Sequence, residues 1–499
     1  MADDASDCSE LEVLLKNYHD SEARIHVCFR NTNGHISEAS NSALKLASGE
    51  WIVFMDHDDM LAPSALDDIK QLIQDNPDAR LIYSDEDKIG DQTCRYNPYF
   101  KSSWNKDLLL SQNYFCHLTA IHRSVVDRVD GFRVGYEGSQ DHDLALRVVE
   151  HIRDDQIHHI PKILYHWRSH SGSTASAGDA KPYAVTAGER AINDHLQRVG
   201  STGHCTHDGE GGYRVRYPIP ERMTGISGVI LSKGKKDALG KCIRQLETIS
   251  EFLNIIIIPT SFAAGPIISG MNLGSQISVL NYDDNHQSLS SLLNGAVDFS
   301  QDDFLFFLHE SLDEINQESL QEMISHAARS DIGAVGGKIL YRDGRVSQAG
   351  LLLDPDKISC PAFQHYQGNS RGYMGRLTLI QNYSAVSKDC MVLEKRKFVE
   401  VGGFDEKQLA TDHLDVDLCL RLKEAGYRTL WTPYAKFTDA SSRFFPRKIL
   451  GRFSASSRKD MKWMQKRWAA LLSNDPAYNP NLNQKKKDFS FKWPPKENE

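Results

Sequence analysis

Residues 41–59 read NSALKLASGEWIVFMDHDD, and the pattern returns at residues 294–312 as NGAVDFSQDDFLFFLHESL. In both stretches an asparagine comes first, an alanine follows two positions later, and an apolar run of strand length ends in polar residues. Further along, residues 129–148 align with residues 401–422 after a two-residue insertion. Two matched segments in the same order indicate a tandem duplication.

Around these segments, apolar runs of strand length alternate with amphipathic runs of helix length. In the first copy WIVFM (51–55) and ARLIYS (79–84) are predicted strands, and residues 62–75 between them are a predicted helix. This alternation is typical of an α/β protein whose mostly parallel sheet is covered by helices. We therefore predict two Rossmann-like domains in tandem.

The second copy has a longer beginning than the first. Ahead of Asn294 lie a predicted strand, a helix and a second strand, whereas ahead of Asn41 lie only a short helix and one strand. The longer beginning consists of ISGVILS (226–232), KKDALGKCIRQLETI (235–249) and NIIIIPT (254–260). We expect the first domain to lack its N-terminal strand-helix-strand, and hence either to be marginally stable or to belong to a longer protein.

Composition changes divide the chain further. The predicted parts are a first domain at 1–200, a linker at 201–224, a second domain at 225–442, and a basic, aromatic helix with a disordered tail at 443–499. The C-terminal helix is expected either to pack on the second domain or to dock on an anionic membrane.

Overall composition excludes several classes of protein. The composition, 40% hydrophobic and 25% charged residues, is ordinary for globular proteins. A chain of 499 residues is too long for a single hydrophobic core. A net charge of -9 argues against a general nucleic-acid binder. The nine cysteines form no CxxC pair and are expected to be reduced thiols of a cytoplasmic protein.

The polar end of the first strand, FMDHDDMLAP (54–63), carries three carboxylates and a histidine. Carboxylates this close repel one another unless a positive group lies among them. Ligands of α/β sheets bind beyond the carboxyl ends of the strands, so Asp56 and Asp58 are predicted to face one bound group. Oxygen ligands with one histidine nearby suit Mg²⁺ or Mn²⁺. The alternative is a solvated turn in which Asp59 caps a helix starting near Pro63.

A second set of candidates lies in GSQDHDLALRV (138–148), at the start of a predicted amphipathic helix. The helix dipole favours carboxylates there, and Arg147 is one turn from Asp143, so Asp143 has a structural explanation. Asp141, on a glycine-rich approach, is the candidate general base for an acceptor hydroxyl.

A third set follows a predicted strand in YHWRSH (165–170). Two histidines bracket an arginine there. His166 or His170 would complete a metal shell, and Arg168 would hold a phosphate.

Together these three motifs resemble the metal, base and C-terminal histidine motifs of family-two glycosyltransferases of the GT-A fold. The resemblance runs from Asp3 to about Tyr434. It is particularly close to tandem-domain members that build bacterial surface polysaccharides of the O-antigen and rhamnan type in four stretches: NGHISEASNSALKLASGEWIVFMDHDD, IYSDEDKI, PYFKSSWNKDLLLSQNY and GSQDHDLALRV.

The resemblance implies a role for each motif. The implied assignments are Asp141 as the base, Asp3, Asp4, Asp56 and Arg168 as donor or nucleotide contacts, Asp58, His166 and His170 as metal contacts, and Glu86, Asp87 and Lys88 as acceptor contacts. For the acceptor segment, a plain polar loop is the alternative.

The implied reaction is an inverting transfer, assisted by Mn²⁺ or Mg²⁺, from a nucleoside-diphosphate sugar to a hydroxyl of a glycan or lipid-linked glycan. No nucleic acid is implied as a partner. The expected location is the cytoplasm, with contact to the inner face of the cell membrane through residues 443–468 as an option.

The second copy departs from these motifs. His309 replaces Asp56, Ser311 replaces Asp58, and KFTDASS (436–442) replaces the histidine motif, although Asp415 matches Asp141. We therefore expect the second domain to be degenerate, serving as a scaffold or an acceptor-binding unit.

Two other functions compete with the transferase. The first, an aspartyl phosphatase, also places DxD after an apolar strand, but its signature does not fit Met60 and Leu61 and it leaves the duplication unexplained. The second is a non-catalytic scaffold or glycan-binding subunit of a polysaccharide assembly complex.

Overall fold

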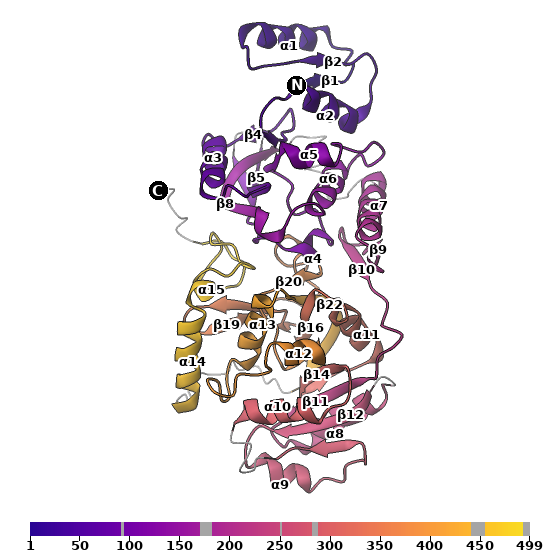
Figure 1. The fold of residues 1–499 in the computed structure, drawn as a ribbon, viewed down its shortest axis with the longest axis vertical. Helices are drawn as coiled ribbons and strands as arrows, with labels where there is room; N and C mark the ends of the chain where they lie inside the picture. The colour runs from indigo at the N-terminus through magenta and orange to yellow at the C-terminus, as the bar shows by residue number, and fades with distance from the viewer. Residues whose placement is uncertain (91–93, 170–181, 250–251, 282–287, 441–454, 493–499) are drawn as a thin grey trace. The chain divides into compact units, whose positions relative to one another are not determined.

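The computed structural model describes residues 1–90, 94–169, 182–249, 252–281, 288–440 and 455–492. The chain forms two compact units, Met1–Val215 and Arg216–Glu499, and each is a mixed α/β structure with its own main sheet (Figure 1). The α/β class predicted from the sequence is confirmed.

The first unit contains short strands and helices of moderate length. Its strands are β1 (Ala2–Asp3), β2 (Cys28–Phe29), β3 (Trp51–Val53), β4 (Met60–Leu61), β5 (Leu81–Ile89), β6 (Arg95–Tyr99), β7 (Thr119–His122), β8 (Ile157–Arg168), β9 (His204–His207) and β10 (Tyr213–Arg216). Its helices are α1 (Ser9–Ser21), α2 (His35–Leu46), α3 (Ala65–Asp75), α4 (Lys106–Leu109), α5 (Arg123–Arg128), α6 (Gln140–Val149) and α7 (Pro182–Arg198).

The main sheet of the first unit has the strand order β3-β7-β5-β8-β4, with β6 paired to β5. Strands β5 and β8 are parallel, while β7 runs antiparallel to both of its neighbours. The sheet is therefore mixed rather than mostly parallel. Helix α3 packs on β8, and α6 and α7 lie side by side (Figure 1). The two short strands β1 and β2 pair with each other in a separate parallel sheet.

The second unit is built from longer strands. They are β11 (Ile226–Ser232), β12 (Phe252–Pro259), β13 (Ile277–Val279), β14 (Phe304–His309), β15 (Leu312–Asp313), β16 (Ile332–Tyr341), β17 (Val346–Gln348), β18 (Leu351–Asp354), β19 (Ile358–Pro361), β20 (Gln381–Asn382), β21 (Cys390–Glu394) and β22 (Arg428–Asp439). The helices are α8 (Lys236–Glu247), α9 (Ala264–Ser269), α10 (Leu289–Phe299), α11 (Gln317–Ala327), α12 (Lys395–Glu400), α13 (Leu414–Glu424), α14 (Ala455–Arg467) and α15 (Ala469–Ser473).

The core of the second unit follows directly from its sequence. Strand β11 is buried at every position, and it lies between the parallel strands β12 and β14. Central parallel strands are buried on both faces, which explains their continuous apolar runs. Helix α8 covers this core with Leu239, Cys242, Ile243 and Leu246, the spacing of one helix face.

The two main sheets share one strand order. In the second unit β14-β21-β16-β22-β15 follow one another with the same relative directions as β3-β7-β5-β8-β4 in the first. Beyond β14 the second sheet continues into β11, β12 and β13. Among the described residues of the first unit, β3 pairs only with β7.

The matched sequence segments also make matched contacts. The side chain of Asn41 bonds both backbone groups of Phe132, at 2.8 and 2.9 Å, and Asn294 bonds both backbone groups of Phe404 at 2.9 Å. A Cβ atom on Gly131 would lie 2.6 Å from the amide oxygen of Asn41, so this approach requires glycine. We call each of these arrangements an Asn clamp.

A second matched contact explains the aspartate that sequence analysis assigned to structure. The buried Asp143 accepts from Arg147, whose guanidinium also donates to the Val129 and Gly131 carbonyls. In the second unit Arg421 donates to Asp417 and to the carbonyls of Val401 and Gly403. These repeat positions hold the fold in both units.

Two boundaries differ from those predicted. The expected linker at 201–224 carries β9 and β10, which pair with each other, and β9 packs on α7. Strand β5, predicted to end at Ser84, continues to Ile89 through the acidic run.

The C-terminal segment packs on the second unit where the structure describes it. In α14 the buried carboxylate of Asp460 accepts the N–H groups of Thr411 and Asp412, each at 3.0 Å. The indole of Trp468 donates to Asp417 at 3.0 Å.

The tail predicted to be disordered is ordered through residue 492. Phe489 is buried and stacks on Phe363 with 4.0 Å between ring centroids, and the N–H of Lys492 donates to the Asn481 carbonyl. The prediction of disorder was wrong because it rested on the charged residues of this run. It overlooked Phe489, which packs against the buried Phe363.

Candidate active site

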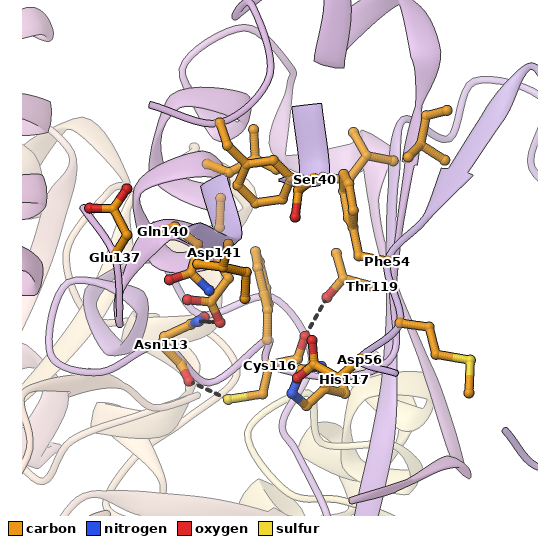
Figure 2. Close-up of a pocket in the computed structure, with 18 of the residues that line it drawn as sticks. Ser40, Phe54, Asp56, Asn113, Cys116, His117, Thr119, Glu137, Gln140 and Asp141 are labelled. Atoms are coloured by element: carbon orange, nitrogen blue, oxygen red, sulfur yellow. Dashed lines mark hydrogen bonds between the residues drawn. The ribbon is translucent and has the colours of Figure 1, made fainter. Parts of the chain in front are cut away.

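The first unit contains a cleft of about 870 Å³. Its walls come from α2, from the end of β3, from the segment between α4 and β7, and from the start of α6. Figure 2 shows Asp56 beside His117 on one side of this cleft and Asp141 beside Asn113 on the other, with Cys116 between them.

Two carboxylates and one imidazole gather at one side of the cleft. Asp56, Asp59 and His117 each offer a ligand atom, and these atoms lie within 4.8 Å of one another. No other such group of three occurs within the described parts of the chain. We call these residues the acidic triad. Carboxylate oxygens with one imidazole fit Mn²⁺ or Mg²⁺, so a divalent cation could bind here.

Tyr165 of β8 fixes the geometry of the acidic triad. Its hydroxyl donates to Asp59 at 2.5 Å and accepts from the Asp56 N–H at 3.2 Å. Burial raises the pKa of Tyr165, so the hydroxyl stays protonated. The His117 ring stacks on the Tyr165 ring with 4.5 Å between centroids.

Arg168, at the end of β8, bonds the segment that carries Asp58 and Asp59. Its N–H donates to Asp59 at 2.7 Å and its Nε donates to the Asp58 carbonyl at 2.6 Å. Asp59 is therefore held by β8 and does not cap a helix. Helix α3 begins later, at Ala65.

The charge around Asp56 favours a cation. Burial of its carboxyl group raises its pKa; His117 opposes the rise, and the carboxylates of Asp59, Asp141 and Asp58 add to it. Like charges that raise a pKa would be neutralised by a bound cation.

Asp141 lies at the opposite side of the cleft, in the first turn of α6. Its Oδ2 accepts from the Asn113 amide at 2.8 Å, and its Oδ1 accepts from the N–H of His142 (Figure 2). These bonds orient a carboxylate that lines the cleft, which is the geometry required of a general base.

The segment that carries Asn113 and His117 is held by a buried ion pair. Lys101 is 1% exposed, and its ammonium donates at 2.6 Å to the carbonyls of both Phe115 and His117. It also contacts Glu86 at 3.3 Å, and Glu86 accepts the His117 N–H at 2.9 Å. One buried pair thus positions residues on both sides of the cleft.

The acceptor residues predicted from the acidic run lie in structural pairs. Glu86 belongs to the buried pair with Lys101, and Asp87 accepts from His166 at 2.5 Å and from Arg95 at 2.6 Å. The third residue, Lys88, lies 4.7 Å above the ring of Trp167, which lines the cleft. Glu86 bonds the backbone of the cleft residue His117, and Lys88 contacts the ring of the cleft residue Trp167.

Neither Asp58 nor His166, which were predicted as metal contacts, belongs to the acidic triad. Asp56, which was predicted as a donor contact, joins the acidic triad, while Asp59 takes the place expected for Asp58 and His117 takes the place expected for the histidine motif. His166 is turned toward Asp87. His170 lies outside the described residues.

The predicted nucleotide contacts Asp3 and Asp4 do not line the cleft. Asp4 pairs with Arg30 at 2.8 Å and accepts the N–H of Gly34, just ahead of α2. The carboxylate of Asp3 accepts the N–H of Ser6.

Sequence reasoning missed His117 and Asn113. Asn113 lies in the family-like stretch PYFKSSWNKDLLLSQNY (98–114) but was assigned no role, and His117 lies three residues beyond that stretch. The strand pairing of β3 with β7 is what places them, since Val53 opposite Ala120 leaves Asp56 opposite His117.

The corresponding place in the second unit is built differently. There Leu308 lies opposite Cys390, which leaves His309 opposite Asp389, so the carboxylate and the imidazole have exchanged positions. Asp415, which matches Asp141, accepts the Lys388 N–H at 3.0 Å and lies 3.7 Å from its ammonium. Burial would raise the pKa of Asp415, but Lys388 and its N–H outweigh burial and lower it.

Comparison with known proteins finds a family model that matches part of the chain. The family model described as "Glycosyl transferase family 2" matches residues 1–130. The uncharacterized protein y4gI of Sinorhizobium fredii is 37% identical over 504 residues, which cover 99% of this chain and 55% of that protein. The O-antigen biosynthesis protein RfbC of Myxococcus xanthus is 28% identical, covering 100% of this chain and 39% of that protein. The chain thus spans about half the length of the curated relatives it matches, or less.

Solved structures resemble only part of the chain. A mannosyltransferase from Pyrobaculum calidifontis in complex with GDP-Man and Mn²⁺ matches with a TM-score of 0.33 and 9% identity, covering 46% of this chain and 60% of that one. Within the described residues, no helix combines the length and apolar character needed to cross a membrane.

Proposed function

We propose that the chain is a glycosyltransferase of family 2, whose family model matches residues 1–130, and that its first unit moves a sugar from a nucleoside-diphosphate sugar to a hydroxyl of a growing surface polysaccharide. The transfer inverts the anomeric carbon and is assisted by a divalent cation. The observation that carries this proposal is the cleft that is lined by Asp56 and His117 of the acidic triad on one side and by Asp141 on the other.

The acidic triad is the proposed cation site. Asp56 and His117 point ligand atoms to a common point with Asp59, which Tyr165 and Arg168 already fix. A divalent cation bound there would stabilise the negative charge on the leaving nucleoside diphosphate.

Asp141 is the proposed base. As the acceptor oxygen forms its bond to the anomeric carbon and the bond to the phosphate oxygen breaks, the hydroxyl proton passes to Asp141. Asn113 keeps the carboxylate turned into the cleft during this step. Attack from the Asp141 side with departure toward the acidic triad inverts the carbon.

We propose that the second unit does not catalyse transfer. Its Asp415 is buried against Lys388, and Leu312 stands where the triad has Asp59. A carboxylate whose pKa is lowered by an ammonium is a weak base.

We also propose a cytoplasmic location. All nine cysteines are free thiols, as expected for a reducing compartment. Contact with an anionic membrane would use the exposed cations of α14, such as Lys462 and Lys466, because Met464 and Trp468 are buried in the second unit.

The proposal is tested with the full chain, a panel of nucleoside-diphosphate sugars and Mn²⁺. Release of nucleoside diphosphate is expected with one donor and is expected to stop with EDTA. Asp141→Asn should lower transfer by about 10²–10⁴-fold, as for other general bases, while leaving donor binding intact.

Asp143→Asn is not a fair control, because Asp143 is buried in the pair with Arg147. Glu137→Gln is better matched, since Glu137 lines the same cleft and should leave the rate nearly unchanged. Full transfer by Asp141→Asn, or no turnover of any donor, would overturn the proposal.

A further inference from the structure

The second unit has a pocket of its own, with a volume of about 240 Å³. It lies at the carboxyl ends of β11, β14 and β22, and its polar lining includes Lys233, Lys235, His309, Asp389 and Asp439. We propose that this pocket binds an uncharged saccharide residue of a glycan, without a metal ion.

The pocket corresponds in position to the cleft of the first unit. The shared strand order and the pairing of β14 with β21 put His309 and Asp389 where Asp56 and His117 stand in the first unit. Asp439, at the end of β22, takes the position of Trp167 at the end of β8. The carboxyl edge of the sheet has therefore kept a binding pocket.

The pocket lacks the metal ligands and the free base that transfer from a nucleoside diphosphate would need. Leu312 replaces the third member of the acidic triad, and no metal-ligating group of three forms among the described residues of this unit. The matched base Asp415 is paired with Lys388. A retained pocket without these groups is suited to binding rather than to transfer.

Two charged groups of the pocket are ready to bind a ligand. The ammonium of Lys235 and the carboxylate of Asp389 make no hydrogen bond to any residue that the structure describes, although both line the pocket. The third polar group, Asp439, accepts from the hydroxyl of Ser311 at 2.9 Å.

The balance of charge favours a neutral ligand. Two lysines face two aspartates, and burial lowers the pKa of His309 and keeps its ring neutral. The carboxylates would repel a phosphate. A sugar hydroxyl both donates and accepts, so it can bond an aspartate and a lysine at once.

The size of the pocket also limits the ligand. Its volume is below the roughly 300–1,000 Å³ of pockets that enclose drug-sized molecules. One sugar ring is therefore a better match than a whole nucleoside-diphosphate sugar. That the sugar belongs to the polysaccharide being extended rests on the proposed function, but the saccharide pocket itself does not.

The test measures ligand binding to the full chain by saturation-transfer NMR in EDTA. The probes are methyl glycosides of common hexoses and 6-deoxyhexoses, with inorganic phosphate and UDP as anionic probes. Asp141→Asn is the background, so that transfer does not consume a ligand. We expect at least one glycoside to bind, and Asp389→Ala and Lys235→Ala each to weaken it about tenfold, as for loss of a charged hydrogen-bond partner.

Lys236→Ala is the matched control, because Lys236 is the next residue along the chain, is exposed and does not line the pocket. It should leave glycoside binding unchanged. Because neither the Lys235 ammonium nor the Asp389 carboxylate makes a hydrogen bond to a described residue, both variants should fold, and melting temperatures check this.

Three results would overturn the saccharide pocket: no glycoside binds, glycoside binding is unchanged in both variants, or phosphate or UDP binds at these residues instead. A transfer assay on the native chain separates the two proposals. Transfer without glycoside binding would refute only the pocket, and glycoside binding without turnover of any donor would refute only the transferase.

Discussion

At the scale of single residues, the hydroxyl of Tyr165 serves two members of the acidic triad. It bonds the Asp59 carboxylate and the Asp56 backbone. Removing a group that orients metal ligands typically lowers metal affinity or activity by about 10–100-fold. We expect Tyr165→Phe to weaken Mn²⁺ binding, measured by calorimetry, to this extent.

Tyr83→Phe is the control for this prediction. Tyr83 is also buried and donates to the Ser102 carbonyl, outside the acidic triad. Equal Mn²⁺ affinity of native chain and Tyr165→Phe would show that the tyrosine does not support a metal site.

The raised pKa of Asp56 predicts that this proposed metal ligand lowers the stability of the folded chain at neutral pH. Since the folded state favours the protonated carboxyl, ionised Asp56 destabilises the fold at neutral pH, and this penalty vanishes near and below the ordinary value of 3.8. In EDTA, Asp56→Asn should therefore melt at a higher temperature than the native chain at pH 7, and the two should converge toward pH 3.8. Calorimetric scans across pH measure the difference. A less stable Asn variant at pH 7 would contradict the prediction.

At the scale of elements, the Lys101–Glu86 pair joins β5 to the segment ahead of β7. Breaking a buried ion pair costs about 3–5 kcal/mol. We expect Lys101→Met to lower the melting temperature and also, in the folded fraction, to lower Mn²⁺ affinity, because His117 loses its anchor. If the Lys101–Glu86 pair only stabilises the fold, Lys101→Met will lower the melting temperature and leave Mn²⁺ affinity unchanged.

Lys162→Met supplies the comparison. Lys162 pairs with Asp68 at 2.7 Å on the surface, and its side chain is 47% exposed. Exposed pairs contribute about 0–1 kcal/mol, so this variant should leave both stability and Mn²⁺ affinity nearly unchanged.

The same elements show what a sequence can and cannot predict. Helix α8 begins and ends within two residues of its predicted bounds, and α3 ends at its predicted last residue, because apolar spacing is a local signal. Strand β5 was predicted too short because its run of carboxylates is typical of a loop. In the structure these carboxylates are paired with His159, Lys101 and His166, which come from distant parts of the chain. The position of His117 depends on β7 running between β3 and β5, which no local pattern reports.

At the scale of the whole molecule, matched substitutions in the two units should have opposite effects. Asp141→Asn is expected to lower transfer by about 10²–10⁴-fold with little change in melting temperature, because its carboxylate lines an open cleft. Asp415→Asn should destabilise the second unit, because it leaves the ammonium of Lys388 buried beside a neutral amide.

Transfer per folded molecule should remain close to native in the Asp415→Asn variant below its melting temperature. Thermal scans and a donor-turnover assay on the same samples measure both quantities. Loss of transfer in folded Asp415→Asn protein would give the second unit a direct part in catalysis.

The exchange of carboxylate and imidazole between the two units also bears on how readily the second unit could regain a metal. His309→Asp alone would set two carboxylates face to face, and Asp389→His alone would set two imidazoles there. Only the double change recreates the Asp56–His117 arrangement, and Leu312 must still become a carboxylate to complete the ligand set. Regaining the ligand set of the first unit would therefore take three substitutions in the second unit, at His309, Asp389 and Leu312.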